Sequence, residues 1–514
     1  MQAKILWADD EIDLLKPHIM FLEQKGYSVD TVNSGTEAVE KCAETNFDII
    51  FLDENMPGIT GLEALSKIKA IRPMTPIVMI TKSEEESIME EAIGGKIADY
   101  LIKPVNPNQI LLSLKKNLDQ GKLVSEKTNA SYQQEFRQIG MELTQHLSAD
   151  EWCKMYDKLV YWDLQLQELE DQGMKEVLDM QLKEANNMFS RFVEDNYTAW
   201  LNGTEESPQL LHTLFKNRIN QHLEEPTFLV VVDNLRYDQW RVLRPILSKY
   251  FHFDDEDMVY SILPTATQYA RNAFFAGLLP SEIQKKFPEY WSGEEDDGGK
   301  NNHEEALLRE QLKRLGRNIK LGYNKITNLD AGKKLNDQFS QLLNNDLNVI
   351  VYNFVDMLSH AKTDMKVIRE LADDEAAYRS LTESWFDHSP LQDIIKKIAN
   401  SGRKLILTTD HGTIRIDNPV KIVGPKHINS NLRYKAGRNL DYDVKKVFQV
   451  KDPSDAFLPK NTISDEYVFC RGNDFFVYPN NYNYYVNYFK DTFQHGGISL
   501  EELLIPYIEM SPKK

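Results

Sequence analysis

Residues 405–412 read Leu-Ile-Leu-Thr-Thr-Asp-His-Gly, a short apolar run that ends in an acidic residue, a histidine and a glycine. Two similar runs precede it, 228–233 (Phe-Leu-Val-Val-Val-Asp) and 349–356 (Val-Ile-Val-Tyr-Asn-Phe-Val-Asp). Short β-branched stretches of this kind predict buried parallel strands. Because ligands of open α/β sheets gather at the carboxyl ends of the strands, we expect the acidic residues to converge on one place.

The residues expected at that edge are carboxylates and imidazoles, which suit a pair of zinc ions, and a paired metal site suits phosphoryl chemistry. Asp356 and His360 are four apart, so both lie on one side of a first helical turn. Gly412 permits the tight backbone geometry that adjacent ligands need. The complete candidate set is Asp233, Asp356, His360, Asp410, His411 and His495. This pattern indicates a metallohydrolase.

Length and composition set limits on the class of protein. A chain of 514 residues is too long for one core, and three domains are expected. The formal net charge of -19 disfavours nonspecific attraction to nucleic-acid backbones. The three cysteines are far apart and in no C-x-x-C spacing, which fits a reducing compartment and argues against a disulfide framework or a thiolate zinc site. No apolar run approaches the roughly 20 residues needed to span a bilayer, so we expect a cytoplasmic protein without membrane insertion.

The first 120 or so residues alternate short apolar strands with helical patterns, which predicts a doubly wound parallel sheet. The expected strands are 4–8, 47–52, 76–80 and 99–102, and the polar residues at their ends are Asp9, Asp10, Asp53, Thr81 and Lys103. A single strand-terminal Asp more often caps a helix, but five polar residues at matching ends favour a site. An acidic pair, a central Asp, a hydroxyl and a lysine suit Mg²⁺ and an acyl phosphate.

The run Asp-Glu-Asn-Met-Pro-Gly at 53–58 and the pair Lys103-Pro104 closely resemble the receiver domains of two-component response regulators. The resemblance implies that a sensor histidine kinase phosphorylates Asp53. It also implies Mg²⁺ binding by Asp10 and Asp53, assisted by Asp9 and the backbone of Asn55. By the same resemblance Thr81 and Lys103 are the phosphate-sensing pair, and Tyr100 is the aromatic switch.

From about 122 to 216 no strand signal is present. The stretch 148–151 (Ser-Ala-Asp-Glu) is a capping-box pattern, and apolar residues follow it at steps of three and four. Gly173 interrupts the pattern, and a second run stops near Asn202-Gly203. A small helical bundle is favoured over a coiled coil. No basic recognition helix is present, so we see no DNA-binding motif. The predicted parts are a receiver at 1–121, a helical linker at 122–216 and a larger α/β domain at 217–514.

The segment 264–267 (Pro-Thr-Ala-Thr) begins a helical pattern that continues to Gly277. A threonine at the start of a helix usually only caps it. Here it would also place a hydroxyl where backbone N–H groups and the helix dipole favour a phosphate. Bound zinc would then turn that hydroxyl into a nucleophile.

An Asp, a hydroxyl nucleophile, Asp-x-x-x-His, Asp-His and a distant His follow in an order that resembles the alkaline phosphatase superfamily. The resemblance assigns Asp233, Thr267, Asp410 and His411 to one zinc and Asp356, His360 and His495 to the other. Within the superfamily, Pro-Thr-x-Thr followed by Gly-Leu-x-Pro looks like the PglZ branch and the nucleotide phosphodiesterases. The distance to Gly277 favours Thr267 over Thr265 as the nucleophile. Arg271, one turn later, is a candidate phosphate clamp or a surface salt bridge.

The insertion at 414–494 is rich in Tyr, Asn, Lys and Arg. Its basic residues include Lys421, Lys426, Arg433, Lys435 and Arg438. Such a segment either caps the site, where it stacks bases or binds phosphates, or is an ordinary surface.

The order of receiver, helical linker and PglZ-like domain resembles the PorX response regulators associated with type IX secretion. The resemblance implies partners among secretion-system components and sigma factors. We predict a zinc-dependent phosphodiesterase that acts on nucleotide or oligonucleotide phosphodiesters, controlled by phosphorylation of Asp53 and by the homodimer that phosphorylation promotes. The alternative is a scaffold or signalling regulator whose PglZ domain is non-catalytic and binds protein partners such as a sigma factor. A DNA-binding regulator is the weakest interpretation.

Overall fold

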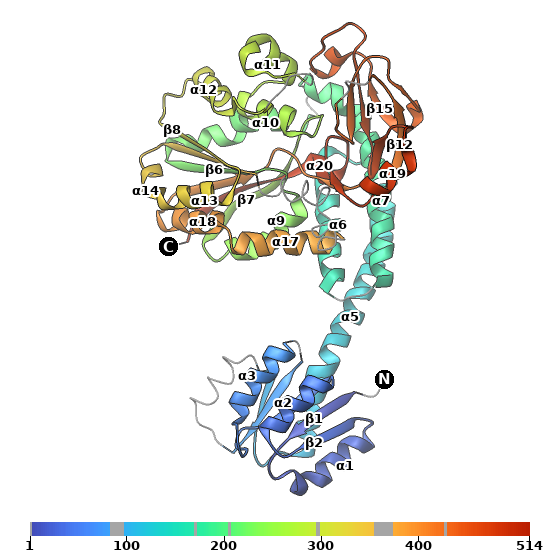
Figure 1. The fold of residues 1–514 in the computed structure, drawn as a ribbon, viewed down its shortest axis with the longest axis vertical. Helices are drawn as coiled ribbons and strands as arrows, with labels where there is room; N and C mark the ends of the chain where they lie inside the picture. The colour runs from blue at the N-terminus through green and yellow to red at the C-terminus, as the bar shows by residue number, and fades with distance from the viewer. Residues whose placement is uncertain are drawn as a thin grey trace. The chain divides into compact units, whose positions relative to one another are not determined.

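The chain forms two compact units, 1–135 and 136–514 (Figure 1). The computed structural model describes residues 3–73, 75–82, 97–168, 172–203, 207–293, 299–353, 374–425 and 429–513. The three-part division at 121 and 216 stays a prediction. None of the described helices combines the length and the hydropathy of a membrane-spanning segment.

The first unit contains a five-stranded parallel sheet in the order β2-β1-β3-β4-β5. Its two faces are buried in separate hydrophobic clusters, because Leu6 and Ile50 face one way while Trp7 and Phe51 face the other. The strands are β1 (Lys4–Ala8), β2 (Ser28–Val32), β3 (Ile49–Asp53), β4 (Ile77–Thr81) and β5 (Asp99–Ile102). The described helices are η1 (Ile12–Leu15), α1 (Lys16–Gln24), α2 (Gly35–Glu44), α3 (Gly61–Ile71) and α5 (Pro107–Leu143), the last of which continues into the second unit. The predicted doubly wound sheet is confirmed.

The second unit is built on a six-stranded sheet in the order β7-β19-β10-β6-β9-β8. Its central strands β10 (Lys404–Thr408), β6 (Thr227–Val232) and β9 (Leu347–Tyr352) are parallel neighbours, which confirms the three predicted strands. Strand β8 (Leu321–Ile326) is also parallel, whereas β19 (Leu504–Pro512) and β7 (Phe251–Tyr260) are antiparallel.

Helices cover both faces of the larger sheet. Figure 1 shows α10 and α12 on one side and α9, α17 and α18 on the other. The helices are α8 (Leu211–Leu214), α9 (Tyr237–Leu247), α10 (Thr267–Ala276), α11 (Pro280–Lys286), α12 (Glu304–Arg314), α13 (Leu329–Asp337), α14 (Phe339–Leu342), α17 (Glu375–Asp387), α18 (Pro390–Asn400) and α20 (Leu500–Leu503). Short π and 3-10 turns are η2 (Phe215–Ile219), η3 (Asn220–Glu224) and η4 (Pro288–Tyr290).

The insertion folds into small sheets of its own. Strands β11 (Ile414–Arg415) and β18 (Phe493–Gln494) pair at its two ends and close it. Between them lie two three-stranded sheets. The remaining elements are β12 (Asn418–Val423), β13 (Tyr434–Gly437), β14 (Asp441–Tyr442), η5 (Val444–Lys446), β15 (Val447–Val450), η6 (Pro453–Ala456), β16 (Glu466–Cys470), β17 (Asp474–Val477) and α19 (Tyr482–Phe489).

Two long linker helices, α6 (Ala149–Glu168) and α7 (Gln172–Leu201), pack against each other and against the large α/β domain. The predicted capping box is present, because Glu151 N donates to Ser148 Oγ and Ser148 N donates to Glu151 Oε2. The rings of Phe189 and Tyr260 lie 6.2 Å apart, so the apolar stripe of α7 extends into the core of the domain that carries the predicted zinc ligands. The linker helices therefore belong to that domain's core as well as to their own.

Candidate metal centre and receiver site

Asp233 and Asp410 lie close together because each follows the carboxyl end of one of two neighbouring parallel strands. Strands β6 and β10 are in register with Thr408 opposite Val231, and both acidic residues follow two positions later. Both carboxylates are buried, with exposed fractions of 1% for Asp233 and 0% for Asp410. A ligand atom from each of them and one from His411 lie within 4.8 Å of one another. Two strand ends thus supply three candidate ligands to one point.

Thr267 is the first residue of α10, and Ala266 occupies the N-cap position without a side-chain cap. Its hydroxyl lies 3.1 Å from Nε2 of His411 and 3.4 Å from Oδ1 of Asp233. Within 261–270 it is the one residue that is not buried. The hydroxyl therefore joins the ligand cluster and does not cap its own helix, and the positive end of the helix dipole lies beside it.

Thr265 is placed differently. It is completely buried, and its hydroxyl donates to the carbonyl of Gly497 at 2.9 Å and accepts from N of Gly496 at 3.0 Å. The Thr265 hydroxyl therefore both donates and accepts a hydrogen bond with backbone groups inside the protein. The accessible alcohol beside the carboxylates is that of Thr267.

The ligand side chains are oriented as a metal site requires. Nδ1 of His411 lies 3.1 Å from the carbonyl of Gly412, so the Nδ1–H donates there and Nε2 keeps its lone pair. The backbone N–H of Asn234 donates to Oδ1 of Asp410 at 3.3 Å. Asn234 has a left-handed φ of 66°, which asparagine tolerates better than most residues. A Cβ at Gly412 would lie 2.1 Å from the carbonyl oxygen of Glu501, so only glycine fits there. Carboxylate and imidazole donors gathered in this way could hold a divalent metal ion.

Arg271 lies under this cluster and has no exposed surface. Its Nη1 is 2.7 Å from Asp233 and 3.9 Å from Asp410, and its Nε donates to Glu304 at 2.6 Å. Burial alone would lower the pKa of Arg271, but Asp233 and Glu304 raise it well above its usual value. Burial also acts to raise the pKa of Glu304, but Arg271, Lys325 and Tyr323 together lower it. Of the two roles predicted for Arg271, the salt bridge is present, but it is buried and does not lie at the surface. The other role, a direct contact with a phosphate, stays a prediction, and the complete burial of Arg271 argues against it.

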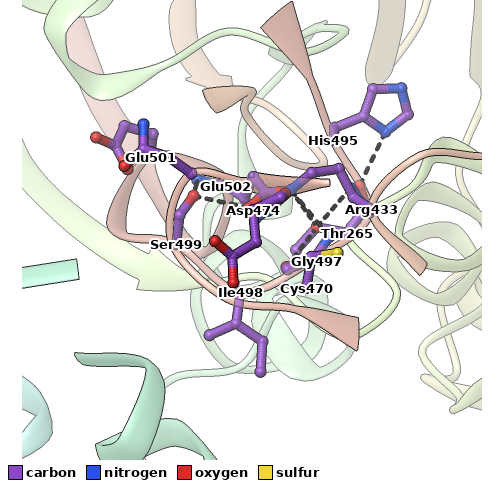
Figure 2. A network of polar contacts seen from close by, with 12 residues as sticks. Thr265, Arg433, Cys470, Asp474, His495, Gly497, Ile498, Ser499, Glu501 and Glu502 are labelled. Atoms are coloured by element: carbon purple, nitrogen blue, oxygen red, sulfur yellow. Dashed lines mark hydrogen bonds and ion pairs between the residues drawn. The ribbon is translucent and has the colours of Figure 1, made fainter. Parts of the chain in front are cut away.

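His495 reaches the cluster through the pairing of β11 with β18, in which Ile414 lies opposite Gln494. Its ring stacks on that of His411. Nδ1 of His495 lies 3.0 Å from the carbonyl of Thr265, so this nitrogen donates to the backbone (Figure 2). The ring of His495 is therefore oriented by the backbone of the segment that carries Thr267.

A buried polar network holds that segment in place (Figure 2). Glu502 receives hydrogen bonds from Nη2 of Arg433 at 2.6 Å and from N of Gly497 at 2.9 Å. The hydroxyl of Thr265 lies 3.4 Å from the same carboxylate. Arg433 and Lys435 of the insertion are both buried, so they serve the structure and are not surface phosphate contacts.

Two predicted ligands of the second zinc, Asp356 and His360, lie outside the described residues. Strand β9, which precedes them, ends at Tyr352 beside β6. The second metal position stays a prediction based on this strand end and on His495.

At the receiver edge, ligand atoms of Asp9, Asp10 and Asp53 also lie within 4.8 Å of one another. Nζ of Lys103 is 2.8 Å from Asp9 and 3.0 Å from Asp53. Burial raises the pKa of Asp53 to about 6, although Lys103 opposes the shift. Burial also acts to lower the pKa of Lys103, but the two carboxylates raise it. A buried carboxylate cluster of this kind fits a hard divalent cation such as Mg²⁺.

The remaining receiver residues lie around this cluster. Thr81 is buried at the end of β4 and Tyr100 is in the adjacent strand β5. The Tyr100 hydroxyl hydrogen bonds Thr81, and burial raises the pKa of Tyr100 in spite of that bond. Asn55 is exposed, two residues beyond Asp53.

Helix α7 touches the two segments that carry Thr267 and His495. The hydroxyl of Tyr197 accepts a hydrogen bond from N of Leu263 at 2.7 Å. Oδ1 of Asn186 accepts from N of Leu500 at 2.8 Å, and Ser190 lies 3.3 Å from the carbonyl of Ile498. Helix α7 is therefore bonded to the segment that precedes Thr267 and to the segment that follows His495, so a shift of α7 would move both segments.

Sequence reasoning missed Asn234, Glu304 and the pair of Arg433 with Glu502. Asn234 had a weak signal, because an asparagine directly after a strand-terminal Asp is a common left-handed position. Glu304 begins an ordinary acidic first turn, and only the folded chain places it against Arg271.

Three family models match the chain. Residues 214–510 match the BREX system PglZ alkaline phosphatase-like domain, 122–201 match the PorX response regulator linker domain, and 5–115 match the response regulator receiver domain.

Among curated proteins, the chain is similar to transcriptional regulatory protein ResD of Bacillus subtilis, 36% identical over 114 residues, which are 22% of this chain and 47% of ResD. It is 35% identical over 118 residues to the alginate biosynthesis regulator AlgB of Pseudomonas putida, covering 23% of this chain and 26% of AlgB. The chain thus spans less than half the length of these relatives. Among solved structures, CheY4 of Vibrio cholerae aligns with 32% identity and a TM-score of 0.22, over 23% of this chain and 100% of CheY4. The BeF3-activated receiver domain of DrrB aligns with 28% identity and a TM-score of 0.22, over 23% of this chain and 99% of that domain.

Proposed function

The chain belongs to the family of PglZ alkaline phosphatase-like domains and has the receiver, linker and PglZ architecture of PorX-like response regulators, and from this premise we propose that it is a phosphorylation-controlled phosphodiesterase that requires zinc. The observation that carries the proposal is the position of Thr267. Its accessible hydroxyl lies within hydrogen-bonding distance of two candidate metal ligands, Asp233 and His411, at a helix N-terminus.

In the proposed reaction, Oγ1 of Thr267 attacks phosphorus, the bond from phosphorus to the leaving ester oxygen breaks, and the departing alcohol takes up a proton. Water then cleaves the threonine phosphoester and regenerates the hydroxyl. Asp233 orients the threonine hydroxyl through Oδ1, and the N-terminus of α10 favours the phosphate oxygens. Asp233, Thr267, Asp410 and His411 would hold one zinc, and Asp356, His360 and His495 the other. When bound, the pair supplies positive charge for the attacking and leaving oxygens.

The receiver supplies the control. A sensor histidine kinase would phosphorylate Asp53 with Mg²⁺ held by Asp9, Asp10, Asp53 and the backbone of Asn55. The added phosphoryl group brings about two negative charges, which Lys103 and Thr81 would bind. Because Tyr100 already hydrogen bonds Thr81, a movement of Thr81 would reposition the Tyr100 ring. A phosphorylation-dependent homodimer is the proposed consequence.

The substrate class and the partners rest on family resemblance. We propose nucleotide or oligonucleotide phosphodiesters as substrates, and secretion-system components of type IX secretion and a sigma factor as protein partners.

The deciding experiment replaces Thr267 by Val, which has nearly the same shape but no hydroxyl. Purified full-length protein is analysed for zinc and assayed on bis-p-nitrophenyl phosphate and p-nitrophenyl phosphate. We expect zinc to be retained, hydrolysis of the diester to be lost, and the wild type to prefer the diester. Thr198→Val, at an exposed position on α7, is the matched control and should be as active as wild type.

Unchanged hydrolysis in Thr267→Val would assign the nucleophile elsewhere. If the zinc-loaded wild type hydrolyses neither ester, with or without beryllofluoride, the scaffold alternative replaces the enzyme.

A further inference from the structure

The loop of Gly496 and Gly497, directly after His495, is held by side chains from two other segments (Figure 2). N of Gly496 donates to the Thr265 hydroxyl at 3.0 Å, and N of Gly497 donates to Oε1 of Glu502 at 2.9 Å. The carbonyl of Gly497 accepts from the Thr265 hydroxyl at 2.9 Å. The backbone that follows His495 is therefore bonded to Thr265 on one side and to Glu502 on the other.

This loop has no room for a side chain. A Cβ at Gly497 would lie 2.7 Å from the carbonyl oxygen of Cys470 and 2.8 Å from Nη2 of Arg433. Gly496 has a φ of 121°, and a Cβ there would lie 2.6 Å from the Tyr434 ring. The loop therefore lies in close contact with the insertion, and its position depends on where Arg433 lies.

Glu502 is completely buried, and its two carboxylate oxygens have different partners. Oε1 accepts from N of Gly497 and, at 3.2 Å, from Nε of Arg433. Oε2 accepts from Nη2 of Arg433 at 2.6 Å and from the Ser499 hydroxyl at 2.7 Å. The guanidinium thus binds the carboxylate through two hydrogen bonds side by side, a geometry that fixes direction as well as distance.

Arg433 is itself fixed within the insertion. It has no exposed surface, its Nη1 donates to the carbonyl of Asp474, and its own carbonyl accepts from N of Cys470 at 2.8 Å. Burial acts to lower the pKa of Arg433, but Glu502 raises it above its usual value, so the guanidinium stays charged. The insertion therefore presents one buried positive charge at a defined place.

A buried ion pair is a weak source of net stability, because the cost of removing both charges from water offsets most of their attraction. The pair of Arg433 and Glu502 does fix the direction of Oε1, which holds N of Gly497 two residues after His495. The His495 ring is fixed from the other side, since its Nδ1 donates to the carbonyl of Thr265 at 3.0 Å. Groups that orient a ligating histidine ring affect metal affinity, because the ligand nitrogen must point at the ion.

We propose that Glu502 is a positioning residue, which together with Arg433 of the insertion holds His495 in the direction needed to bind the second metal ion. The inference rests on the proposed function, because it takes His495 as a metal ligand. It gives the insertion a role beyond the two predicted from sequence: Arg433 acts on the site through Glu502 and the glycine loop, without contact to the substrate.

The test measures zinc affinity by competition with a chromogenic chelator on purified full-length protein. Glu502→Gln keeps the shape of the side chain but removes its charge and one acceptor oxygen. We expect the affinity for one of the two zinc ions to fall about tenfold, the lower end of the range for residues behind a ligand. The affinity for the other ion should be unchanged, because its proposed ligands are oriented by Arg271, Asn234 and Gly412.

Glu509→Gln is the matched control. Glu509 is buried on β19, with an exposed fraction of 6%, and accepts a hydrogen bond from the Tyr507 hydroxyl at 2.8 Å. Its carboxylate lies 3.9 Å from Nζ of Lys404, the first residue of β10, whereas Asp410 follows the other end of that strand. Glu509→Gln should lower stability and leave both zinc affinities unchanged.

Two further measurements complete the test. Arg433→Lys keeps the buried charge but loses the paired contact, so the same affinity should fall roughly threefold, as expected for one weakened hydrogen bond. This variant decides the question if Glu502→Gln fails to fold. Hydrogen exchange at N of Gly497 should be faster in both variants, because its acceptor is no longer held in place.

Faster exchange with unchanged zinc affinity would overturn the proposal, since Glu502 would then only support the loop. An equal fall in zinc affinity in Glu509→Gln would overturn it as well. Neither readout needs turnover, so the two proposals fail separately. A protein that shows the affinity change but hydrolyses no diester loses the phosphodiesterase and keeps the positioning role. One that hydrolyses bis-p-nitrophenyl phosphate, with zinc affinity unaffected by Glu502→Gln, loses only the positioning role.

Discussion

The rings of His411 and His495 stack with their centroids 4.3 Å apart and 19° between their planes. The whole insertion separates them in the chain, and the pairing of β11 with β18 brings its ends back together. Each ring is oriented by a backbone carbonyl at its Nδ1, that of Gly412 for His411 and that of Thr265 for His495. The candidate site is therefore closed by contacts that lie outside the large sheet.

Replacing His495 by Ala should lower zinc content from about two ions per chain to about one, and diester hydrolysis by a factor of about 100. The reason is that His411, Asp233 and Asp410 stay in place for the first ion. Elemental analysis and initial rates on the same preparation check both effects. Full zinc content in His495→Ala would remove His495 from the ligand set.

Thr265 and Thr267 should show opposite effects when each is replaced by Val. Thr265→Val leaves buried backbone groups of Gly496 and Gly497 without partners, so the free energy of unfolding should fall by about 1–3 kcal/mol. Thr267→Val should change stability little and remove activity. Urea unfolding and diester hydrolysis measure the two quantities. A stable, inactive Thr265→Val protein would reverse the assignment.

Arg271→Met should be strongly destabilising, by about 3–5 kcal/mol, because it removes the buried guanidinium that pairs with both Asp233 and Glu304 and leaves Glu304 only Lys325. The loss should be smaller in the zinc-loaded protein, since a bound cation also offsets the charges of Asp233 and Asp410. Thermal unfolding with and without a chelator tests whether the destabilisation by Arg271→Met is smaller in the zinc-loaded protein. Arg309→Met, which removes an exposed helical pair with Glu305, is the control and should change stability by less than about 0.5 kcal/mol.

Glu501 gives a prediction for pH. Burial raises its pKa to about 7 from 4.5, with Arg236 opposing the shift. The folded protein thus binds this proton more tightly than the unfolded chain, so stability falls as pH rises from 4.5 to 7. The full penalty of about 3 kcal/mol is present above pH 7.

Glu501→Gln keeps an oxygen for Nδ2 of Asn186 and removes the charge. It should stabilise the protein at pH 8 and have little effect near pH 4.5, as measured by denaturant unfolding at both values. Glu289→Gln, at an exposed position, is the control. Equal stabilisation at both pH values would contradict the proposal that the charge of buried Glu501 causes the loss of stability at high pH.

Beryllofluoride with Mg²⁺ should convert wild type from monomer to dimer in light scattering, because it mimics the charge added at Asp53. Asp53→Asn should stay monomeric under the same conditions. If the wild type stays monomeric, phosphorylation does not act through dimer formation.

Much of this arrangement followed from local sequence. Apolar runs ending in Asp predicted the carboxyl edge of the parallel strands in each sheet, because strand direction alone places those residues together. The capping box at Ser148 was equally readable, since it depends on residues three apart. Arg271 shows where such reasoning ends: its place one turn after Thr267 suggested a phosphate contact, whereas Glu304 and Asp233 enclose it.

By itself, the sequence determined the strand ends, the receiver cluster around Asp53 and the order of the candidate ligands, because these depend on short-range patterns and strand direction. Only the tertiary structure decided that Thr267 is partly exposed while Thr265 is buried, and that Arg433 of the insertion pairs with Glu502 of α20. It also decided that α7 reaches the nucleophile segment through Tyr197. The physical reason is that burial and pairing depend on which distant segments pack together, and one residue's type and spacing do not specify that.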